Sequence, residues 1–149
     1  MKHTIFTGMA TAIVTPMAAD GSIDYEALGR FIEFQIENGI NALVVMGTTG
    51  ENATIEPEDQ KKVIASTVEK VAKRVPVIAG TGTNNTEHVL HNTKNACEVG
   101  ADAILVVTPY YNKATQTGLI KHYTYVADRV NTPIILYNVP SRTGTTIQP

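Results

Sequence analysis

Short runs of apolar residues recur along the chain about every thirty residues, and stretches of mixed polarity separate them. The runs are rich in valine, isoleucine, leucine and alanine and contain few polar residues. Such short, continuous apolar runs are typical of strands that are covered on both faces. The predicted strands span residues 10–14, 42–46, 76–80, 103–107 and 133–137.

The stretches between these runs carry apolar residues at helical spacing, which predicts four amphipathic helices. The apolar stripes of these helices lie at residues 28–36, 63–71, 89–97 and 119–130. Asp24 is suited to cap the first helix, Pro57 to begin the second and Thr86 to cap the third. Asn38-Gly39 marks the end of the first helix. We expect no helix after the fifth strand.

Strands that alternate with helices at this period predict right-handed βα units and therefore a parallel sheet. The open doubly wound sheet and the (β/α)8 barrel both use this pattern, and periodicity alone does not separate them. Polar, turn-forming motifs after the strands favour the barrel. The chain has no G-x-G-x-x-G after its first strand and no Walker A sequence, so a nucleotide site would lack its phosphate-binding loop.

The composition is that of a globular protein, with 149 residues of which 43% are hydrophobic and 17% charged. The net charge of -2 and the scattered lysines and arginines argue against a nucleic-acid partner. The N-terminus lacks an apolar signal core, and no run is long enough to span a membrane. The single cysteine, Cys97, is predicted to pack in the core. We therefore expect a cytoplasmic protein without a membrane anchor.

The first candidate for chemistry is Gly47-Thr48-Thr49-Gly50-Glu51, which follows the second strand. The two glycines allow a sharp turn and a close approach of the backbone to a ligand. In parallel α/β proteins the carboxyl ends of the strands are where ligands bind. The alternative is a strand-to-helix turn in which Thr48 or Thr49 only caps backbone groups.

A second candidate is Tyr137, at the end of the fifth strand, with Arg142 five residues later. An arginine offers a planar fork for a carboxylate, and a tyrosine hydroxyl can pass a proton. The alternative is a strand-end aromatic residue and a surface arginine. The pair Tyr110-Tyr111 follows the fourth strand and is also typical of an oligomer interface.

Three motifs together resemble the dihydrodipicolinate synthase (4-hydroxy-tetrahydrodipicolinate synthase) family. They are residues 47–51, 109–112 and 137–144, after the second, fourth and fifth strands. The family belongs to the pyruvate-dependent class I aldolases, with N-acetylneuraminate lyase as a relative. The resemblance covers essentially all of residues 1–149 but only the first half of the family's pattern. It implies one incomplete TIM (β/α)8 barrel domain, with the first five strands and four helices.

The resemblance implies condensation of pyruvate with aspartate 4-semialdehyde in lysine and diaminopimelate biosynthesis. Thr48, Tyr111 and Tyr137 match the family's proton relay, with Tyr111 reaching into the site of a neighbouring subunit. Thr49 matches the position whose backbone helps to hold the carboxylate of pyruvate. Arg142 matches the arginine for the carboxylate of aspartate semialdehyde, which favours a synthase over a sugar-acid lyase. A homodimer or a homotetramer is also implied.

The family's catalytic lysine, which forms a Schiff base with pyruvate, lies on the sixth strand, and no residue of this sequence matches it. Lys113 is the lysine predicted to lie on the same side as the three motifs. A solvent-exposed lysine is mostly protonated at neutral pH and is therefore a poor nucleophile. We expect this chain to be inactive alone. The alternatives are a non-catalytic half-barrel that complements another chain, and an active enzyme of which these residues are a part.

The resemblance also implies a site for feedback inhibition by lysine, in which several positions are altered. Ala53, Asn84 and Tyr110 match the family's site. The positions that in inhibited members usually carry Ser, His, His and Glu are here Asn52, Pro57, Gln60 and His88. Because a carboxylate is lost at position 88, we predict weak or absent inhibition by lysine.

The histidines do not form a metal-binding pattern. His88 and His91 are three residues apart on one predicted helix, without a carboxylate or a third ligand beside them, and His3 and His122 lie elsewhere in the sequence. We predict no metal and no cofactor.

Overall fold

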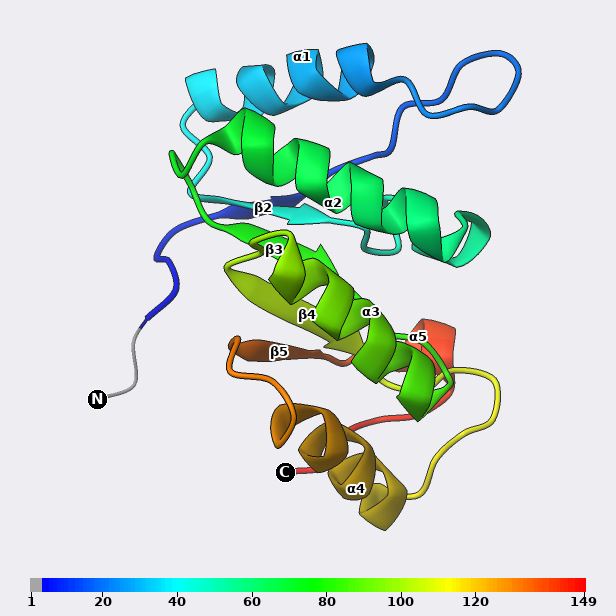
Figure 1. Cartoon of the computed structure of the whole chain (residues 1–149). Helices are drawn as coiled ribbons and strands as arrows, with labels where there is room; N and C mark the ends of the chain where they lie inside the picture. Colours follow the sequence, from blue (N-terminus) through cyan, green and yellow to red (C-terminus); the bar gives the residue numbers. More distant parts are fainter. Residues whose placement is uncertain (1–3) are drawn as a thin grey trace.

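The structure is a computed structural model that describes residues 4–149; His3 lies outside the described residues. Its centre is a parallel sheet of five strands in the order β1-β2-β3-β4-β5 (Figure 1). The strands are β1 (Ala10–Ala12), β2 (Ala42–Val45), β3 (Val77–Gly80), β4 (Ala103–Val107) and β5 (Ile134–Tyr137). Consecutive strands are neighbours, as a chain of right-handed βα units requires.

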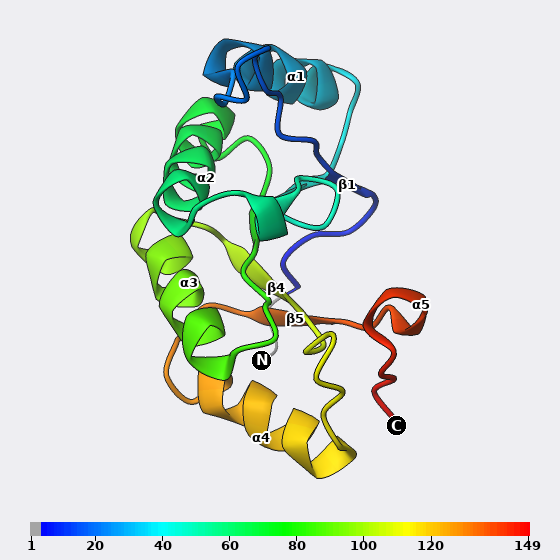
Figure 2. The ribbon, with the colours of Figure 1, turned by 90° about the vertical axis from the view of Figure 1, so that its right-hand side faces the viewer.

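Four long helices connect the strands, and they lie along one side of the curved sheet (Figure 2). They are α1 (Tyr25–Glu37), α2 (Pro57–Val71), α3 (Thr86–Glu98) and α4 (Gln116–Ala127). A short 3-10 helix, η1 (Asn52–Thr54), follows β2, and α5 (Pro140–Thr143) follows β5. The expected α/β fold, an incomplete (β/α)8 barrel, is confirmed.

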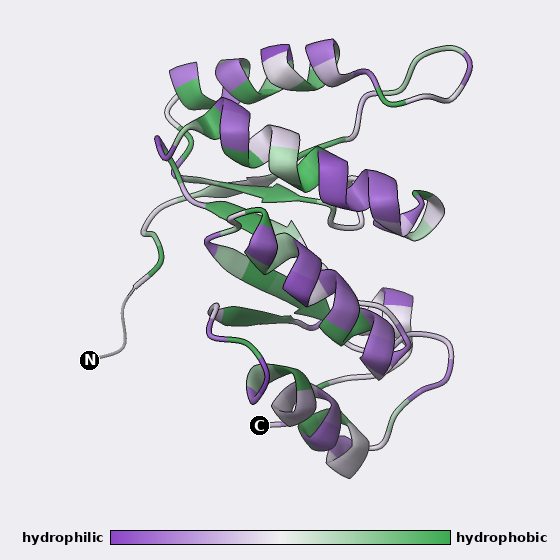
Figure 3. Cartoon of the chain, viewed as in Figure 1, coloured by the Kyte–Doolittle hydropathy of each residue, from purple (hydrophilic) through white to green (hydrophobic). Residues whose placement is uncertain are grey.

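The apolar core lies mainly between the helices and the outer face of the sheet. Leu28, Ile32, Val63, Ile104 and Val126 are almost fully buried there. The helices accordingly carry their apolar residues toward the sheet and their polar residues toward solvent (Figure 3). Within the described residues, no helix is both long and apolar enough to cross a membrane.

A second, smaller apolar cluster lies on the inner face of the sheet. Ala42, Ile78 and Ala103 form it, and Ile5 and Phe6 pack against it from the segment before β1. This cluster closes the inner face toward the amino ends of the strands. At the carboxyl ends of the strands, the inner face is bordered by the loops that carry the candidate site.

Several expected helix ends are confirmed, and one is wrong. The Asp24 carboxylate accepts a hydrogen bond from the Ala27 amide at 2.8 Å, and Pro57 begins α2. The cap of α3 is Asn85, not Thr86 as predicted: the side-chain oxygen of Asn85 accepts from the amides of Glu87 and His88. The hydroxyl of Thr86 instead pairs with His122 Nδ1 at 2.9 Å.

The expectation that no helix follows the fifth strand is also wrong, since α5 comes three residues after β5. Pro140 supplies its first position, and Gly144 ends it with a φ of 67°. The predicted first strand was too long, because Ile13 and Val14 lie beyond the three residues of β1. The packing role predicted for Cys97 is confirmed, since this half-buried residue packs against the core.

Candidate active site

The loop after β2 forms a compact turn that presents Thr48 at the carboxyl end of the sheet. The Gly50 amide donates to the Gly47 carbonyl at 3.1 Å, and the Glu51 amide donates to the Thr48 carbonyl at 3.1 Å. The buried Thr15 hydroxyl donates to the Gly50 carbonyl at 2.7 Å and so ties this turn to the loop after β1. The turn is therefore held from two sides.

Two glycines, Gly80 at the end of β3 and Gly82 just after it, bring the ends of neighbouring strands close together. A Cβ on Gly80 would overlap the carbonyl oxygen of Met46, and a Cβ on Gly82 would overlap the amide nitrogen of Val107. Any other residue would push the neighbouring loops apart. These glycines therefore allow the backbone at the ends of β2 and β4 to lie close to the end of β3.

The end of β5 supplies the other two polar groups. Tyr137 is the last residue of β5 and pairs in register with Val107 of β4. The chain then turns into α5, which carries Arg142 in its single turn. The guanidinium is exposed, whereas the Tyr137 ring is half-buried.

Thr48, Tyr137 and Arg142 line the same hollow, which has a volume of about 310 Å³. They reach it from the loop after β2, from the end of β5 and from α5. Its remaining wall is formed by Gly47, Glu51, Asn52, Ala53, Thr54, Gly80, Gly82, Leu105, Val107, Tyr110, Val139 and Thr143. A few polar groups above an apolar floor are typical of a site for a small polar ligand.

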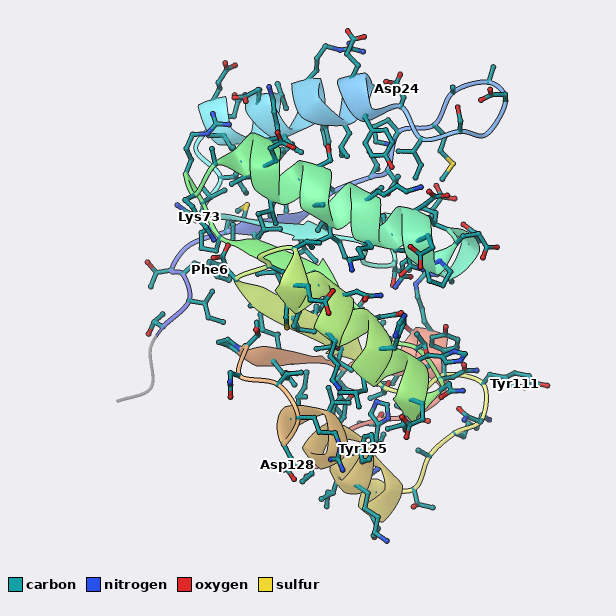
Figure 4. The ribbon with its side chains drawn as sticks, in the orientation of Figure 1. Phe6, Asp24, Lys73, Tyr111, Tyr125 and Asp128 are labelled. Atoms are coloured by element: carbon teal, nitrogen blue, oxygen red, sulfur yellow. The ribbon has the colours of Figure 1, made fainter. Side chains whose placement is uncertain are left out.

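Thr49 and Tyr111 do not line this hollow. The side chain of Tyr111 is 89% exposed and points away from the sheet at the end of its loop (Figure 4). Its φ of 70° is unusual for a residue with a side chain, and it turns the ring outward. Three of the five predicted site residues are thus brought together, and the other two are not.

A second hollow, with a volume of about 460 Å³, adjoins the first and shares Asn52, Ala53, Thr54, Gly82 and Tyr110 with it. All seven residues matched to the family's lysine site lie around it: Asn52, Ala53, Pro57, Gln60, Asn84, His88 and Tyr110. Only the resemblance to the family, and no pattern in the sequence itself, led us to expect these seven residues to lie together. Whether this hollow binds lysine stays a prediction.

No lysine lines the first hollow in the part of the chain that the structure describes. The exposed Lys113 lies beside Gly144, with its Cε 3.1 Å from where a Cβ on that glycine would stand. Across residues 4–149, no three His, Cys, Asp or Glu side chains lie close enough together to hold a metal ion.

Two of the pKa shifts that burial causes belong to neighbouring residues of α4, outside the hollow. Burial lowers the pKa of the His122 imidazole and raises the pKa of the Tyr123 hydroxyl to about 12. The two rings meet edge to face, with their centroids 5.1 Å apart. This buried pair is a structural feature of the helix layer rather than a part of the hollow.

The sequence interpretation did not assign Leu105, Val107 and Tyr110 to the wall of the first hollow. Alternation along β4 was the available signal for the first two, because residues 103, 105 and 107 share one face of the strand. Gly80 was predicted only as the end of the third strand, and Gly82 only as part of the turn after it. Their close contacts with β2 and β4 depend on sheet curvature, which the sequence does not display.

The sheet order, the helices on its outer side and the hollow at the carboxyl ends of the strands are those of a (β/α)8-barrel protein. The Dihydrodipicolinate synthetase family model matches residues 5–149, and the chain belongs to this family. Members of this family are lyase-type synthases of lysine and diaminopimelate biosynthesis.

The curated relatives and the solved structures agree with this assignment. The 4-hydroxy-tetrahydrodipicolinate synthase of Acetivibrio thermocellus is 55% identical over 149 residues, which are 100% of this chain and 51% of that protein. The dihydrodipicolinate synthase from Aquifex aeolicus superimposes with a TM-score of 0.93 at 52% identity, covering 96% of this chain and 48% of that one.

A chloride-inhibited dihydrodipicolinate synthase from Acinetobacter baumannii, complexed with pyruvate, has a TM-score of 0.95 at 49% identity. The match covers 97% of this chain and 50% of that one. The chain therefore spans about half the length of the relatives it matches.

Proposed function

We propose that this chain forms the part of a 4-hydroxy-tetrahydrodipicolinate synthase that binds aspartate 4-semialdehyde and relays protons during its condensation with pyruvate. The observation that carries the proposal is the convergence of Thr48, Tyr137 and Arg142 on one hollow. A relative with the same fold is complexed with pyruvate, which supports a small keto acid as one substrate. Both proposed substrates are small enough for such a hollow.

In the proposed reaction, a lysine amine attacks the carbonyl carbon of pyruvate and releases water, which leaves a Schiff base. Loss of a methyl proton gives an enamine, whose carbon attacks the aldehyde carbon of the second substrate. The resulting alkoxide takes up a proton. In the cyclisation, the amino group of the second substrate attacks the Schiff-base carbon, and the lysine amine leaves. The Tyr137 hydroxyl is suited to this proton traffic because it lies at the hollow, opposite a strand end that presents Thr48.

The lysine for this reaction must come from outside residues 4–149, since no lysine of the described chain lines the hollow. We therefore propose that the chain alone does not turn over substrate. Thr49 is assigned to pyruvate binding through its backbone, which agrees with a side chain that does not enter the hollow.

Arg142 supports a synthase over an N-acetylneuraminate lyase. A guanidinium binds a carboxylate through two parallel hydrogen bonds, whereas a sugar acid presents hydroxyls at that end. A charge-assisted hydrogen bond contributes about 1.5–3 kcal/mol, which corresponds to about one to two decades of preference. The second substrate proposed is therefore an aldehyde that carries a carboxylate.

The outward position of Tyr111 supports an oligomer in which this ring reaches the hollow of a neighbouring copy. An exposed tyrosine held in a left-handed backbone conformation has no role in the packing of its own chain. We propose a homodimer as the smallest complete assembly, and a pair of dimers as the homotetramer. The cytoplasm is the proposed location.

A borohydride experiment tests the proposal. The chain is incubated with pyruvate and sodium borohydride, alone and together with a polypeptide that supplies the remaining strands of the barrel, and the intact masses are read. We expect no adduct on this chain alone, and we expect an adduct on the added polypeptide together with turnover in the mixture. An adduct on this chain alone would show that one of its own lysines is a nucleophile, with Lys113 the first candidate, and would contradict the proposal.

A second candidate function is that of a non-catalytic half-barrel that completes another chain. It is favoured by the edges of the sheet, because β1 and β5 each pair with a single strand among residues 4–149. Leu136 of β5 is also 48% exposed. An added polypeptide that binds this chain without any adduct or turnover would support this role.

A further inference from the structure

The side chain of Gln116 fastens the segment that follows Arg142 to the start of α4. Its Nε2 donates a hydrogen bond to the Thr146 carbonyl oxygen at 2.8 Å. Its Oε1 accepts one from the Gln148 amide at 3.1 Å. The side-chain amide of Gln116 therefore both donates and accepts a hydrogen bond on one stretch of backbone, as a peptide group of a neighbouring strand would.

The same segment is held by contacts on its other side. Asn138 Oδ1 accepts a hydrogen bond from the Ile147 amide at 3.1 Å, and the Ile147 side chain packs against the main core. The buried Thr143 hydroxyl donates to the Thr145 carbonyl oxygen at 2.9 Å. Residues 143–148 therefore have a fixed path from α5 back to α4.

This path matters because α5 is too short to fix its own position. A helix of four residues has a single turn, and one turn of helix is not stable in isolation. The orientation of the Arg142 guanidinium therefore depends on the anchors before and after α5. Gln116 is the anchor that connects α5 to a long helix of the outer layer.

We propose that Gln116 is a positioning residue for the aldehyde substrate, because it helps to hold Arg142 in the orientation that binds the carboxylate of that substrate. Gln116 does not itself line the hollow. The inference rests on the proposed function, because it assigns to Arg142 the carboxylate of the aldehyde substrate. Two-point binding of a carboxylate requires the guanidinium fork to be held in one orientation, and Gln116 supplies part of that restraint.

The test uses the catalytically complete protein that contains this chain, with Gln116→Ala and the nearly isosteric Gln116→Met. We expect the KM for aspartate semialdehyde to rise about tenfold, because the carboxylate contact loses its alignment. The KM for pyruvate and the yield of the borohydride-trapped adduct should stay within about twofold of the unmutated protein. Thr146→Ala is the matched control, since only the backbone carbonyl of Thr146 receives the hydrogen bond.

A double-mutant cycle with Arg142→Ala separates positioning from general loosening of the structure. If Gln116 acts through Arg142, then Gln116→Ala should have less than about a twofold effect on the aldehyde KM once Arg142 is gone. A full tenfold effect in that background would overturn the proposal. The proposal would also be overturned if the aldehyde KM were unchanged in both Gln116→Ala and Gln116→Met. The same holds if these variants lost as much pyruvate adduct as they lost affinity for the aldehyde. If the unmutated protein forms no pyruvate adduct at all, the proposed function itself fails.

Discussion

At the scale of single residues, the hollow brings a hydroxyl, a phenol and a guanidinium from three separate segments to one place. Thr48, Tyr137 and Arg142 are spread over about ninety residues of sequence, but parallel strands bring their carboxyl ends to one edge of the sheet. The phenol is the group best suited to move protons. The guanidinium of Arg142 is suited to bind a carboxylate.

Replacement of Tyr137 by phenylalanine tests the proton relay. In the catalytically complete protein, Tyr137→Phe should lower kcat by about 100-fold or more, because general acid-base catalysis is lost while the ring remains. Steady-state kinetics measures the effect. Tyr125→Phe is the control, since the Tyr125 hydroxyl bonds Glu87 at 2.7 Å between α3 and α4, away from the hollow. A kcat for Tyr137→Phe equal to that of the control would refute the relay role.

The second hollow gives a prediction about lysine. At His88 an imidazole stands where the resemblance implies a carboxylate, so the complete protein should bind free lysine weakly or not at all. His88→Glu should strengthen lysine binding by about one to two decades, as expected for a charge-assisted hydrogen bond to the ammonium group. Calorimetric titration measures the affinity, with His88→Gln as the uncharged control. Half-inhibition of the unmutated protein at sub-millimolar lysine would contradict this account.

The residues of the hollow were predictable to the extent that they follow strand ends. Tyr137 ends one apolar run and Thr48 follows another by two residues, and the rule for parallel sheets places both at the same edge. The direction of Tyr111 was not predictable from spacing, because it depends on a φ of 70°. The Gln116 contacts were also hidden, since they join positions thirty or more residues apart through a loop path.

At the scale of helices, the start of α3 depends on one side chain. The Asn85 side-chain oxygen accepts from two free amides of the first turn. Asn85→Ala should lower the free energy of unfolding by about 1 kcal/mol, whereas Asn85→Asp keeps the acceptor and should have little effect. Urea unfolding followed by circular dichroism measures both variants. An equal loss in the two variants would show that the cap is not what stabilises this turn.

The contact between α3 and α4 is expected to make the stability of the protein depend on pH. His122 Nδ1 pairs with Thr86, and within the described residues its buried Nε2 has no hydrogen-bond partner. Burial lowers the pKa of this imidazole below its ordinary value of 6.5. At pH values between the lowered pKa of His122 in the folded chain and its ordinary pKa in the unfolded chain, the unfolded chain binds more protons than the folded chain does. The free energy of unfolding should therefore fall as the pH drops below about 6.5.

His122→Gln removes this titration and should weaken the dependence of stability on pH. Urea unfolding near neutral pH and about two pH units lower measures the difference. His91→Gln is the control, because His91 is exposed on the outer face of α3. If His122→Gln and the unmutated chain lose the same stability on acidification, the buried imidazole is not the responsible group.

The four long helices were predictable because each carries a clear apolar stripe. The short α5 was not, since four residues are too few to show a period. Its signals were Pro140 and Gly144, which mark a helix start and a helix end as well as an ordinary turn. Thr86 was mistaken for the cap of α3 because Asn85 and Thr86 are adjacent residues and both are suited to that position.

At the scale of the whole molecule, the sheet is curved but ends at β1 and β5 within the described chain. Unpaired strand edges invite association with another chain. At the β5 edge, the 48% exposed Leu136 adds an apolar side chain to the free backbone groups. The strand period predicted a parallel α/β sheet, and the motifs after the strands favoured the barrel over the open sheet. Whether the edge strands are covered depends on what pairs with them, which the sequence does not show.

We expect the isolated chain to self-associate through β5 as its concentration rises. Leu136→Lys should shift it toward the monomer, because an edge lysine must lose its hydration to be covered by another strand. Sedimentation velocity over a range of concentrations measures the shift. Ile120→Lys is the control, since Ile120 is 67% exposed on α4, away from the sheet edge. If Ile120→Lys releases the monomer and Leu136→Lys does not, the helix layer and not the β5 edge makes the contact.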